Sequence, residues 1–281
     1  MCEFCLKHGE GKKWYLQAQN YADDLLSDVN RRRFIRSFLA DPAALEKEVH
    51  DLERLNRLPP FIRRLVGHLV TRKMKKIHFG QIVPIEEIEQ IFGFVNTIVR
   101  VACICRQASL GQEKRYCYGV SLAPQGGRFA EILADLDASY LTGPDHQGLE
   151  VLTREEAMEA FRGHEHEGLC HSVWTFHTPF IGGICNCDRS DCMAMRCTVT
   201  QGVPVMFRGE YVAQVDPDLC VGCRECLRVC QFGALTYSAA NQKAVVDQHW
   251  CYGCGVCRAS CKKDAISLAD RGAIPAVANL W

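Results

Sequence analysis

The sequence predicts an α+β protein with three regions and a short tail. Amphipathic helix patterns fill the first region, helix and strand patterns alternate in the middle, and the last region carries eight cysteines in two runs of equal spacing. We expect a helical N-terminal region at 1–79, a cysteine-rich α+β domain at 80–211, a small cysteine-rich domain at 212–270 and a C-terminal tail at 271–281. The hydrophobic content of 48% over 281 residues is enough for ordinary cores.

The eighteen cysteines are the most unusual feature of the composition. Such a number indicates either a disulfide framework in an oxidising compartment or thiolates held by metal in a reducing one. Residues 1–15 lack the apolar stretch of a secretion signal, and the most apolar window, 91–105, is interrupted by Asn96 and Arg100. We therefore expect metal-bound thiolates, no transmembrane segment and a cytoplasmic location. The 33 basic and 33 acidic residues cancel, so no nucleic-acid partner is expected.

Two amphipathic helices are predicted in the first region. Asp41 followed by Pro42 is typical of an N-cap with proline at the first helical position, and apolar residues then recur at helical spacing as far as Pro59. A second helix follows Pro60 and carries many basic residues, with no acidic residue between Phe61 and Ile85. This basic helix is either a surface helix with solvated side chains or a docking face for an acidic partner protein.

The middle region reads as mixed α+β. Residues 84–92 predict a helix and residues 97–106 are strand-like. Thr153 with Glu156 forms a capping box for a helix that Gly168 closes, and residues 169–177 are again strand-like.

The C-terminal runs predict iron–sulfur clusters. Both follow the spacing C-x2-C-x2-C-x3-C, the first at Cys220, Cys223, Cys226 and Cys230 and the second at Cys251, Cys254, Cys257 and Cys261. A cubane cluster needs four thiolates at the corners of a tetrahedron, and C-x2-C-x2-C wraps a loop around three of its irons. The fourth ligand must come from elsewhere in the chain. The alternative is a pair of zinc sites, although zinc ribbons usually separate two C-x2-C pairs.

This segment of about sixty residues resembles the bacterial two-[4Fe-4S] ferredoxins. In that family the fourth cysteine of each run binds the cluster of the other run. The resemblance implies one cluster on Cys220, Cys223, Cys226 and Cys261 and another on Cys251, Cys254, Cys257 and Cys230. It also implies that the strands 232–237 and 263–268, which follow the two runs, pair across a pseudo-twofold axis.

One departure from the ferredoxin pattern affects the electrostatics of the clusters. The family places proline after the fourth cysteine, whereas this chain has Gln231 and Lys262, which keep a backbone N–H. Lys262 and Lys263 also place positive charge beside a cluster. Both changes are expected to favour the reduced form and to raise the reduction potential of that cluster.

The middle region contains a second set of cysteines. Cys103 and Cys105 stand in C-x-C-R at a predicted strand end, and Cys185 and Cys187 stand in I-C-N-C after a predicted Gly-Gly turn. Such polar, loop-like settings are unusual for inert buried thiols, so we expect at least one metal centre. The full set is Cys103, Cys105, Cys117, Cys170, Cys185, Cys187, Cys192 and Cys197.

Over residues 80–270 the chain is similar to ferredoxin-fused proteins of strict anaerobes. In that class C-x-C-R, a later cysteine, Gly-Leu-x-His and I-C-N-C precede a two-cluster ferredoxin module, and residues 168–171 fit the third element. Relatives crowd more cysteines after I-C-N-C, where this chain has polar residues from Asp188 to Asp191. We expect a third [4Fe-4S] cluster drawn from Cys103, Cys105, Cys117, Cys185, Cys187 and Cys192, and a fourth only if Cys170 and Cys197 join. A zinc site is the alternative.

The N-terminal C-x2-C pair and the histidines give weaker signals. Cys2 and Cys5, with His8 beyond, suit a redox dithiol, two ligands of a small metal site or a flexible chain end that contacts another subunit. Their role therefore stays open. The histidines at 164, 166, 171 and 177 are expected to be surface or hydrogen-bonded residues, with His171 beside Cys170 as the exception to test.

The expected function is one-electron transfer through three or four clusters. Short motifs for nucleotides and for hydrolase nucleophiles do not occur, and no small-molecule substrate is expected. The residues outside the ferredoxin-like segment favour a subunit of an anaerobic oxidoreductase complex, with other subunits or a soluble electron carrier as partners and the catalytic centre in another chain. The alternatives are an enzyme whose middle cluster binds substrate, with Asp188 or His171 completing the site, and a cluster-based redox sensor.

Overall fold

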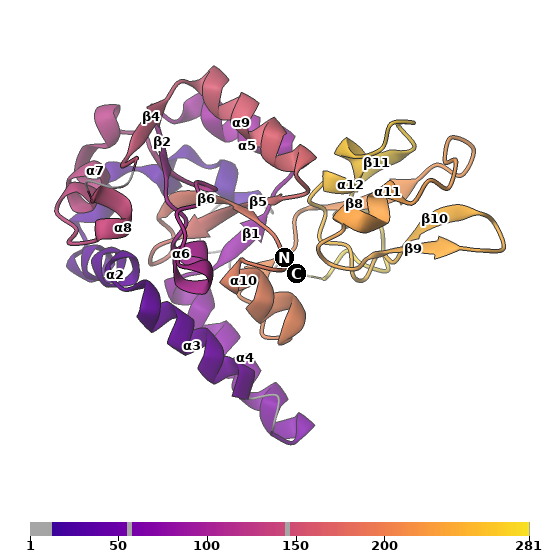
Figure 1. The fold of residues 1–281 in the computed structure, drawn as a ribbon, viewed down its shortest axis with the longest axis horizontal. Coiled ribbons are helices and arrows are strands. Elements are labelled where there is room, and N and C mark those ends of the chain that lie inside the picture. The colour runs from indigo at the N-terminus through magenta and orange to yellow at the C-terminus, as the bar shows by residue number, and fades with distance from the viewer. Residues whose placement is uncertain (1–12, 55–57, 144–146, 281) are drawn as a thin grey trace.

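A computed structural model describes residues 13–54, 58–143 and 147–280 of the protein, which form a helix-covered sheet and a small C-terminal module (Figure 1). The sheet has seven strands in the order β4-β2-β3-β6-β5-β1-β7. Neighbours are antiparallel except for β1 and β7. The predicted α+β class is confirmed. The strands are β1 Gly80–Ile82, β2 Thr97–Val101, β3 Cys117–Ser121, β4 Glu150–Leu152, β5 Cys170–Thr175, β6 Ile181–Cys187 and β7 Met206–Phe207.

One face of the sheet is covered by α5, Ile85–Phe94, and α9, Arg154–His166. The predicted capping box of α9 is present, because Glu156 N–H donates to Thr153 Oγ1 and Thr153 N–H donates to the Glu156 carboxylate. The apolar sides of both helices pack on strand residues such as Val120 and Val173. Burial of this face supplies the main hydrophobic core.

The first described residues belong to the same core. Three 3₁₀ helices cross the sheet, and Trp14, Tyr15 and Tyr21 are fully buried against α5 and β3 residues. The N-terminal region and the middle region therefore share a hydrophobic core. The 3₁₀ helices are η1 Trp14–Leu16, η2 Ala18–Tyr21 and η3 Asp23–Ser27.

The other face of the sheet is divided into two halves. At one end it is covered by α2 (Val29–Ala40), α7 (Gly127–Ala134) and α8 (Ser139–Thr142). The 3₁₀ helix η5 (Pro124–Gly126) directly precedes α7. At the other end it is covered by α6 (Ile104–Leu110), α10 (Met193–Met195) and the π-helix η6 (Arg196–Thr200). The second half holds the cysteines of the middle region.

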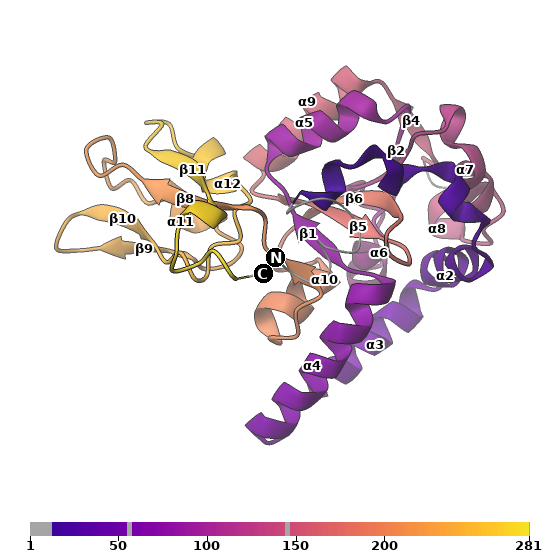
Figure 2. The same cartoon turned by 180° about the vertical axis from the view of Figure 1, so that it is seen from behind.

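Two long helices project from the body as an arm (Figures 1 and 2). The first, α3, spans Pro42–Arg54 and begins as predicted, with Ala44 N–H donating to Asp41 Oδ1 at 2.9 Å. The second, α4, spans Pro60–Ile77 and has proline in its first turn. The inner side of the arm packs Val49 and Met74 near α6 and α10. None of the helices that the structure describes combines the length and apolar character needed to cross a membrane.

The C-terminal module consists of two antiparallel two-stranded sheets and two short helices. Strand β8, Tyr211–Val215, pairs with β11, Ile266–Asp270, and β9, Leu235–Ser238, pairs with β10, Lys243–Val246. The prediction that the strands following the two runs pair with each other is wrong. Each pairs with the strand that precedes the other run. The helices are α11 Glu225–Val229 and α12 Val256–Ala259, and the 3₁₀ helix η7 Arg271–Ala273 leads into a tail that buries Val277 in the module.

Candidate functional site: two cysteine pockets and a thiol group

An aspartate sets the entry into each C-terminal cysteine run. Asp216 Oδ1 accepts from Asp218 N–H at 2.8 Å, and Asp247 Oδ1 accepts from His249 N–H at 2.9 Å. Such Asx turns reverse the chain after a strand. The backbone carbonyls of the same aspartates accept from the N–H groups of Cys220 and Cys251, at 3.0 and 3.1 Å. Equal local chemistry therefore gives the two runs equal starting geometry.

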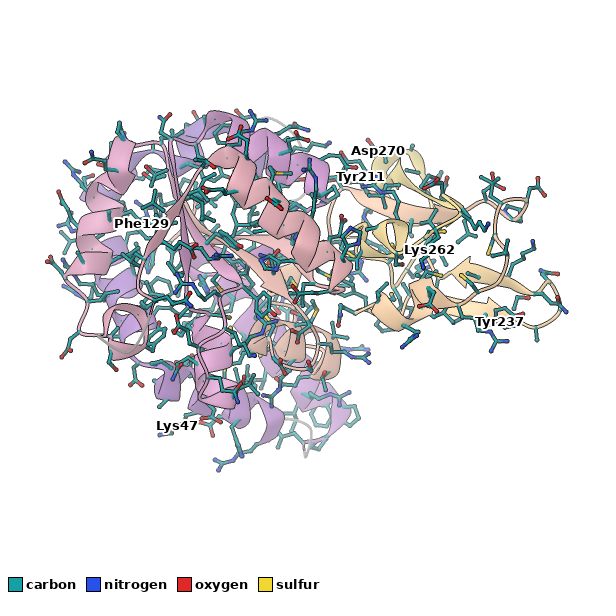
Figure 3. All side chains as sticks on the ribbon, turned by 45° about the horizontal axis from the view of Figure 1, so that its top comes forward. Lys47, Phe129, Tyr211, Tyr237, Lys262 and Asp270 are labelled. Atoms are coloured by element: carbon teal, nitrogen blue, oxygen red, sulfur yellow. The ribbon has the colours of Figure 1, made fainter. Side chains whose placement is uncertain are left out.

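The first pocket, on the outer part of the module, is lined by cysteines from both runs. Its wall includes Cys220, Cys223, Cys226 and Cys261, the set that the ferredoxin resemblance implies. Among the described cysteines Cys223 alone is exposed. Figure 3 shows Tyr211 on the side of the module that faces the sheet and Tyr237 at its outer end, where Arg224 lies 3.8 Å from the Tyr237 ring centroid. The first pocket therefore faces solvent.

The second pocket lies next to the middle region. It is lined by Cys230, Cys251, Cys254 and Cys257, again one cysteine from the first run and three from the second. Each pocket encloses about 370 Å³ of space without protein atoms, open solvent included. The fold thus places the fourth cysteine of each run in the wall of the other run's pocket.

Two glycines make the loops around the pockets possible. Gly222 and Gly253 precede the second cysteine of their runs and have φ of +69° and +75°. A Cβ at these positions would lie 2.3 Å from Gln242 O and 2.2 Å from Tyr211 O. Only glycine combines this φ with such an approach to another backbone.

The polar surroundings of the sulfurs suit iron-bound thiolates. Ala213 N–H donates to Cys251 Sγ, and Ala234 N–H donates to Cys230 Sγ, both at 3.3 Å. Burial raises the pKa of the Cys257 thiol well above its ordinary value, and burial also raises the pKa of Cys226 to about 11. A neutral thiol is therefore favoured when no metal binds, whereas bonding to iron removes the proton. Backbone N–H groups directed at the sulfurs are the usual partners of a [4Fe-4S] cluster, so the residues of both pockets fit this group.

Six cysteines of the middle region converge on the same face of the large sheet. Hydrogen bonds between sulfurs connect them in a chain, and Cys117 Sγ lies 3.3 Å from Cys185 Sγ. We call this set the thiol group. Its order of contacts is Cys185, Cys117, Cys103, Cys105, Cys192 and Cys187.

The sheet positions half of the thiol group. Side chains alternate between the faces of a strand, so Cys185 and Cys187 of β6 point to one face and Asn186 points to the other. Cys117 is the register partner of Cys185 on β3. The expectation that I-C-N-C lies in a loop after a Gly-Gly turn is wrong, since Gly182 and its neighbour belong to β6. A Cβ at Gly182 would lie 2.9 Å from the Phe180 ring, so glycine makes room for aromatic packing.

Helix starts position two further members. The strand-like run predicted for 97–106 ends at Val101, and Cys103 becomes the N-cap of α6. Cys192 is the N-cap of α10. The pKa of Cys103 is lowered because its sulfur accepts from Cys105 and Cys117, and the backbone N–H of Arg106 adds to this. The pKa of Cys192 is lowered in the same way, because its sulfur accepts hydrogen bonds from Cys105 and Cys187. Both sulfurs therefore favour thiolate, the form that binds metal.

Arg106 is the functional residue that the sequence analysis missed. Its guanidinium is 2% exposed, lies 3.7 Å from Cys103 Sγ and donates to Asn186 O at 3.2 Å. It forms ion pairs with Asp188 and Asp191 and stacks on the Tyr116 ring. Burial alone would lower the pKa of Arg106, but the Cys103 thiolate and Asp188 raise it above its ordinary value. The arginine of C-x-C-R therefore places a fixed cation beside the thiol group.

The remaining two cysteines of the middle region lie apart from each other. Cys170 begins β5, is fully buried, and its thiol hydrogen-bonds to the sulfur of Cys254 in the second pocket. Cys197 packs instead with Val49, Met193 and Val205 below α6. The sequence analysis expected a fourth cluster only if Cys170 and Cys197 join in one set. The structure keeps these two cysteines apart.

The histidines lie away from the thiols. His171 Nδ1 hydrogen-bonds Asn186 Oδ1 at 2.6 Å on the opposite face of the sheet, and burial lowers its pKa to about 4. His164 Nε2 hydrogen-bonds the Tyr118 hydroxyl at 2.8 Å on that face. The hypothesis that His171 completes a metal site is therefore wrong for geometric reasons. Asp188, the other residue suggested for this role, is paired with Arg106.

Several contacts fix the module against the sheet. Gln231 Nε2 donates to Gly168 O at 2.8 Å, and Arg189 N–H donates to Gln231 Oε1 at 2.9 Å. The rings of Phe232 and Tyr252 stack with centroids 4.0 Å apart within the buried cluster that includes Cys170 and Cys187. The thiol group and the second pocket thus share one apolar interface.

Single-ion metal sites and disulfides do not occur among the described residues. Within residues 13–54, 58–143 and 147–280, no set of three or more His, Cys, Asp or Glu side chains is arranged around a point that suits a single metal ion. The described cysteines, from Cys103 to Cys261, form no disulfide with one another. Cys2, Cys5 and His8, whose role was left open, lie outside the described residues.

Comparison with known families supports part of this assignment. Residues 213–236, which contain the first cysteine run, match the family described as 4Fe-4S binding domain, Fer4. No curated protein matches the chain. The chain therefore contains a ferredoxin-type module, which supports at least one [4Fe-4S] cluster and iron–sulfur electron transfer.

Proposed function

We propose that the protein relays single electrons through three [4Fe-4S] clusters as a subunit of an anaerobic oxidoreductase complex. The observation that carries this proposal is the continuous series of cysteines from the thiol group through Cys170 to the second pocket. Clusters bound there would supply one-electron redox chemistry. The catalytic centre would lie in another chain.

The ligand sets follow from the two pockets and the thiol group. Cys220, Cys223, Cys226 and Cys261 would hold one cluster, and Cys230, Cys251, Cys254 and Cys257 would hold the second. A third would take four ligands from the six members of the thiol group. Arg106 would balance part of the negative charge there, and the backbone N–H groups of Arg106 and Met195 would bond Cys103 and Cys192.

The order of the three sites suggests a direction for the relay. The first pocket reaches solvent at Cys223, whereas the members of the thiol group are buried or half-buried beneath α6 and the module. An external electron carrier would therefore exchange electrons at the first pocket. The thiol group would exchange electrons with the second pocket across the junction.

Helix α4 provides a docking face for a partner subunit. Phe61, Leu65 and Leu69 are 73%, 61% and 57% exposed and, being four residues apart, form one apolar stripe. The other exposed residues of α4 after Phe61 are basic or histidine, namely Arg63, Arg64, His68, Arg72, Lys73 and Lys76. Since no acidic residue occurs between Phe61 and Ile85, the partner fitting this face is a protein with an apolar groove and an acidic rim.

The deciding experiment is iron and acid-labile sulfide analysis of the anaerobically purified protein with EPR of the reduced sample. The proposal expects about twelve irons per chain, because each cluster holds four. A value of about eight would remove the cluster of the middle region. An iron-free protein that remains folded and active without oxygen would refute the electron-transfer function itself.

A further inference from the structure

The most informative unassigned feature is the position of Cys170 beside the second pocket. It is the first residue of β5, it is fully buried, and its thiol hydrogen-bonds to the sulfur of Cys254. Cys170 belongs to neither C-terminal run, and it comes from the large sheet. Four cysteines line the second pocket, and Cys170 adds a fifth thiol next to Cys254, whereas a cluster needs four.

The backbone fixes this fifth thiol in place. Gly168, two residues before Cys170, accepts from Gln231, the residue after Cys230. On its other side Cys170 is the register partner of Cys187 across β5 and β6. Cys170 is thus anchored to the pocket by one neighbour and to the thiol group by another.

We propose that Cys170 is a fifth iron-ligating residue of the second pocket, able to replace Cys254. This inference rests on the proposed function, because it requires a cluster in the pocket. The exchange is balanced without a redox partner. One iron–sulfur bond to Cys170 forms as the bond to Cys254 breaks, and one proton moves from the Cys170 sulfur to the Cys254 sulfur. The electron count of the cluster does not change.

The exchange gives the second pocket two ligand sets with different consequences. With Cys254 all four ligands belong to the C-terminal module. With Cys170 one ligand comes from the sheet, so the cluster would connect the two parts of the protein covalently through iron.

The test compares alanine variants of the anaerobically purified full-length chain by iron and sulfide content and by EPR. Alanine is used because a serine oxygen could itself bind iron. Cys254→Ala is expected to keep the wild-type iron content with shifted EPR g-values, since Cys170 takes over. Cys251→Ala, the matched control from the same loop, is expected to lose about four irons, and so is the double variant Cys170→Ala/Cys254→Ala.

Circular dichroism and gel filtration show whether each variant is folded, and Cys254→Val serves as a second variant without an iron-binding atom at the same position. Equal iron loss in Cys254→Ala and Cys251→Ala overturns the inference. Iron loss in Cys170→Ala alone also overturns it, because Cys170 would then be an obligatory ligand of another cluster. An iron-free wild-type protein overturns the proposed function together with this inference, whereas the first two outcomes leave the proposed function in place.

Discussion

Gln231 joins the C-terminal module to the large sheet by donating from its side-chain amide to Gly168 O at 2.8 Å. The same side chain accepts from Arg189 N–H at 2.9 Å. Ferredoxins place proline at this position, and a proline could make neither bond. The departure from the family pattern therefore has a structural use, which is to hold the second pocket against the middle region.

Replacing Gln231 by alanine should loosen the junction. Two hydrogen bonds of about 1 kcal/mol each are lost, so the free energy of unfolding should fall by about 2 kcal/mol. The amide of Arg189 should exchange with deuterium faster, which hydrogen-exchange mass spectrometry measures. Lys262→Ala changes the equivalent, exposed position after the second run and should leave that exchange rate unchanged. Equal exchange in the two variants would contradict the role of Gln231.

Removing the charge of Arg106 should lower the reduction potential of the proposed middle cluster. A unit charge about 4 Å from a thiolate is worth about 4 kcal/mol at an effective dielectric constant near 20, so Arg106→Met should lower the potential by on the order of 100 mV. EPR-monitored redox titration gives this value. Arg106→Lys should recover part of the shift, because it restores the charge without the planar guanidinium. A Met variant that titrates like wild type would contradict this electrostatic role.

The thiol group can be separated from other buried cysteines by paired substitutions. Cys103→Ala removes the sulfur that contacts Cys105, Cys117 and Arg106, and about four irons per chain should be lost with it. Cys197→Ala removes an equally buried sulfur that lies outside the thiol group, so the iron content should stay at the wild-type value. Similar iron contents in the two variants would mean that Cys103 is not an obligatory ligand, since the thiol group holds six thiols and one cluster needs four.

The buried carboxyl of Glu165 should make the free energy of unfolding decrease as pH rises. Its Oε1 is buried without a hydrogen-bond partner among the described residues, and burial raises its pKa to about 7 from 4.5. The folded state therefore holds a proton that the unfolded state releases between pH 4.5 and 7, and the full cost above this window is about 3 kcal/mol. Glu165→Gln should be more stable than wild type, by a margin that grows by about 1 kcal/mol between pH 6 and pH 8.

Anaerobic urea denaturation at both pH values measures this margin. Glu159→Gln on the exposed side of α9 is the control, and its stability should follow the wild-type pH dependence. Parallel profiles for Glu165→Gln and wild type would show that the carboxyl is ionised in the folded protein at neutral pH.

The apolar stripe of α4 should be required for partner binding. Leu65→Glu places a negative charge in the centre of the stripe and should weaken capture of an acidic redox subunit at least tenfold, a loss of about 1.4 kcal/mol or more. Iron content and EPR should stay unchanged, because the Leu65 side chain is exposed and does not belong to the buried cluster that joins the arm to Cys105 and Cys197. Binding of Leu65→Glu to the native partner with wild-type affinity would contradict this docking face. Loss of self-association or of salt-dependent nucleic-acid binding in the variant would assign the face to those ligands instead.

Local signals in the sequence predicted the helices well. The caps at Asp41 and Thr153 depend only on residues within the next helical turn, so the sequence alone predicted them. The same holds for the apolar residues that recur every three to four positions after Phe61. The convergence of six middle cysteines also agrees with the set that the sequence analysis proposed. That these six bind iron stays a prediction.

Long-range relationships were predicted less well. Strand β8 pairs with β11 about fifty residues further along the chain, and this pairing cannot be read from local signals. The pairing of β9 with β10 is a local hairpin that the assumed pseudo-twofold pairing overlooked. The burial of Arg106 and the contact between Cys170 and Cys254 depend on segments more than eighty residues apart. Strand alternation could have placed His171 opposite to Cys170, since the two are adjacent in a predicted strand.

The interface between the module and the sheet also constrains how the protein is assembled. Phe232 and Tyr252, which pack with Cys170 and Cys187, are synthesised after every cysteine of the middle region. A cluster on the middle cysteines would therefore have to be assembled before these rings close over them, or the module would have to open again to admit iron and sulfide. Assembly of such a cluster would thereby be coupled to folding of the C-terminal module.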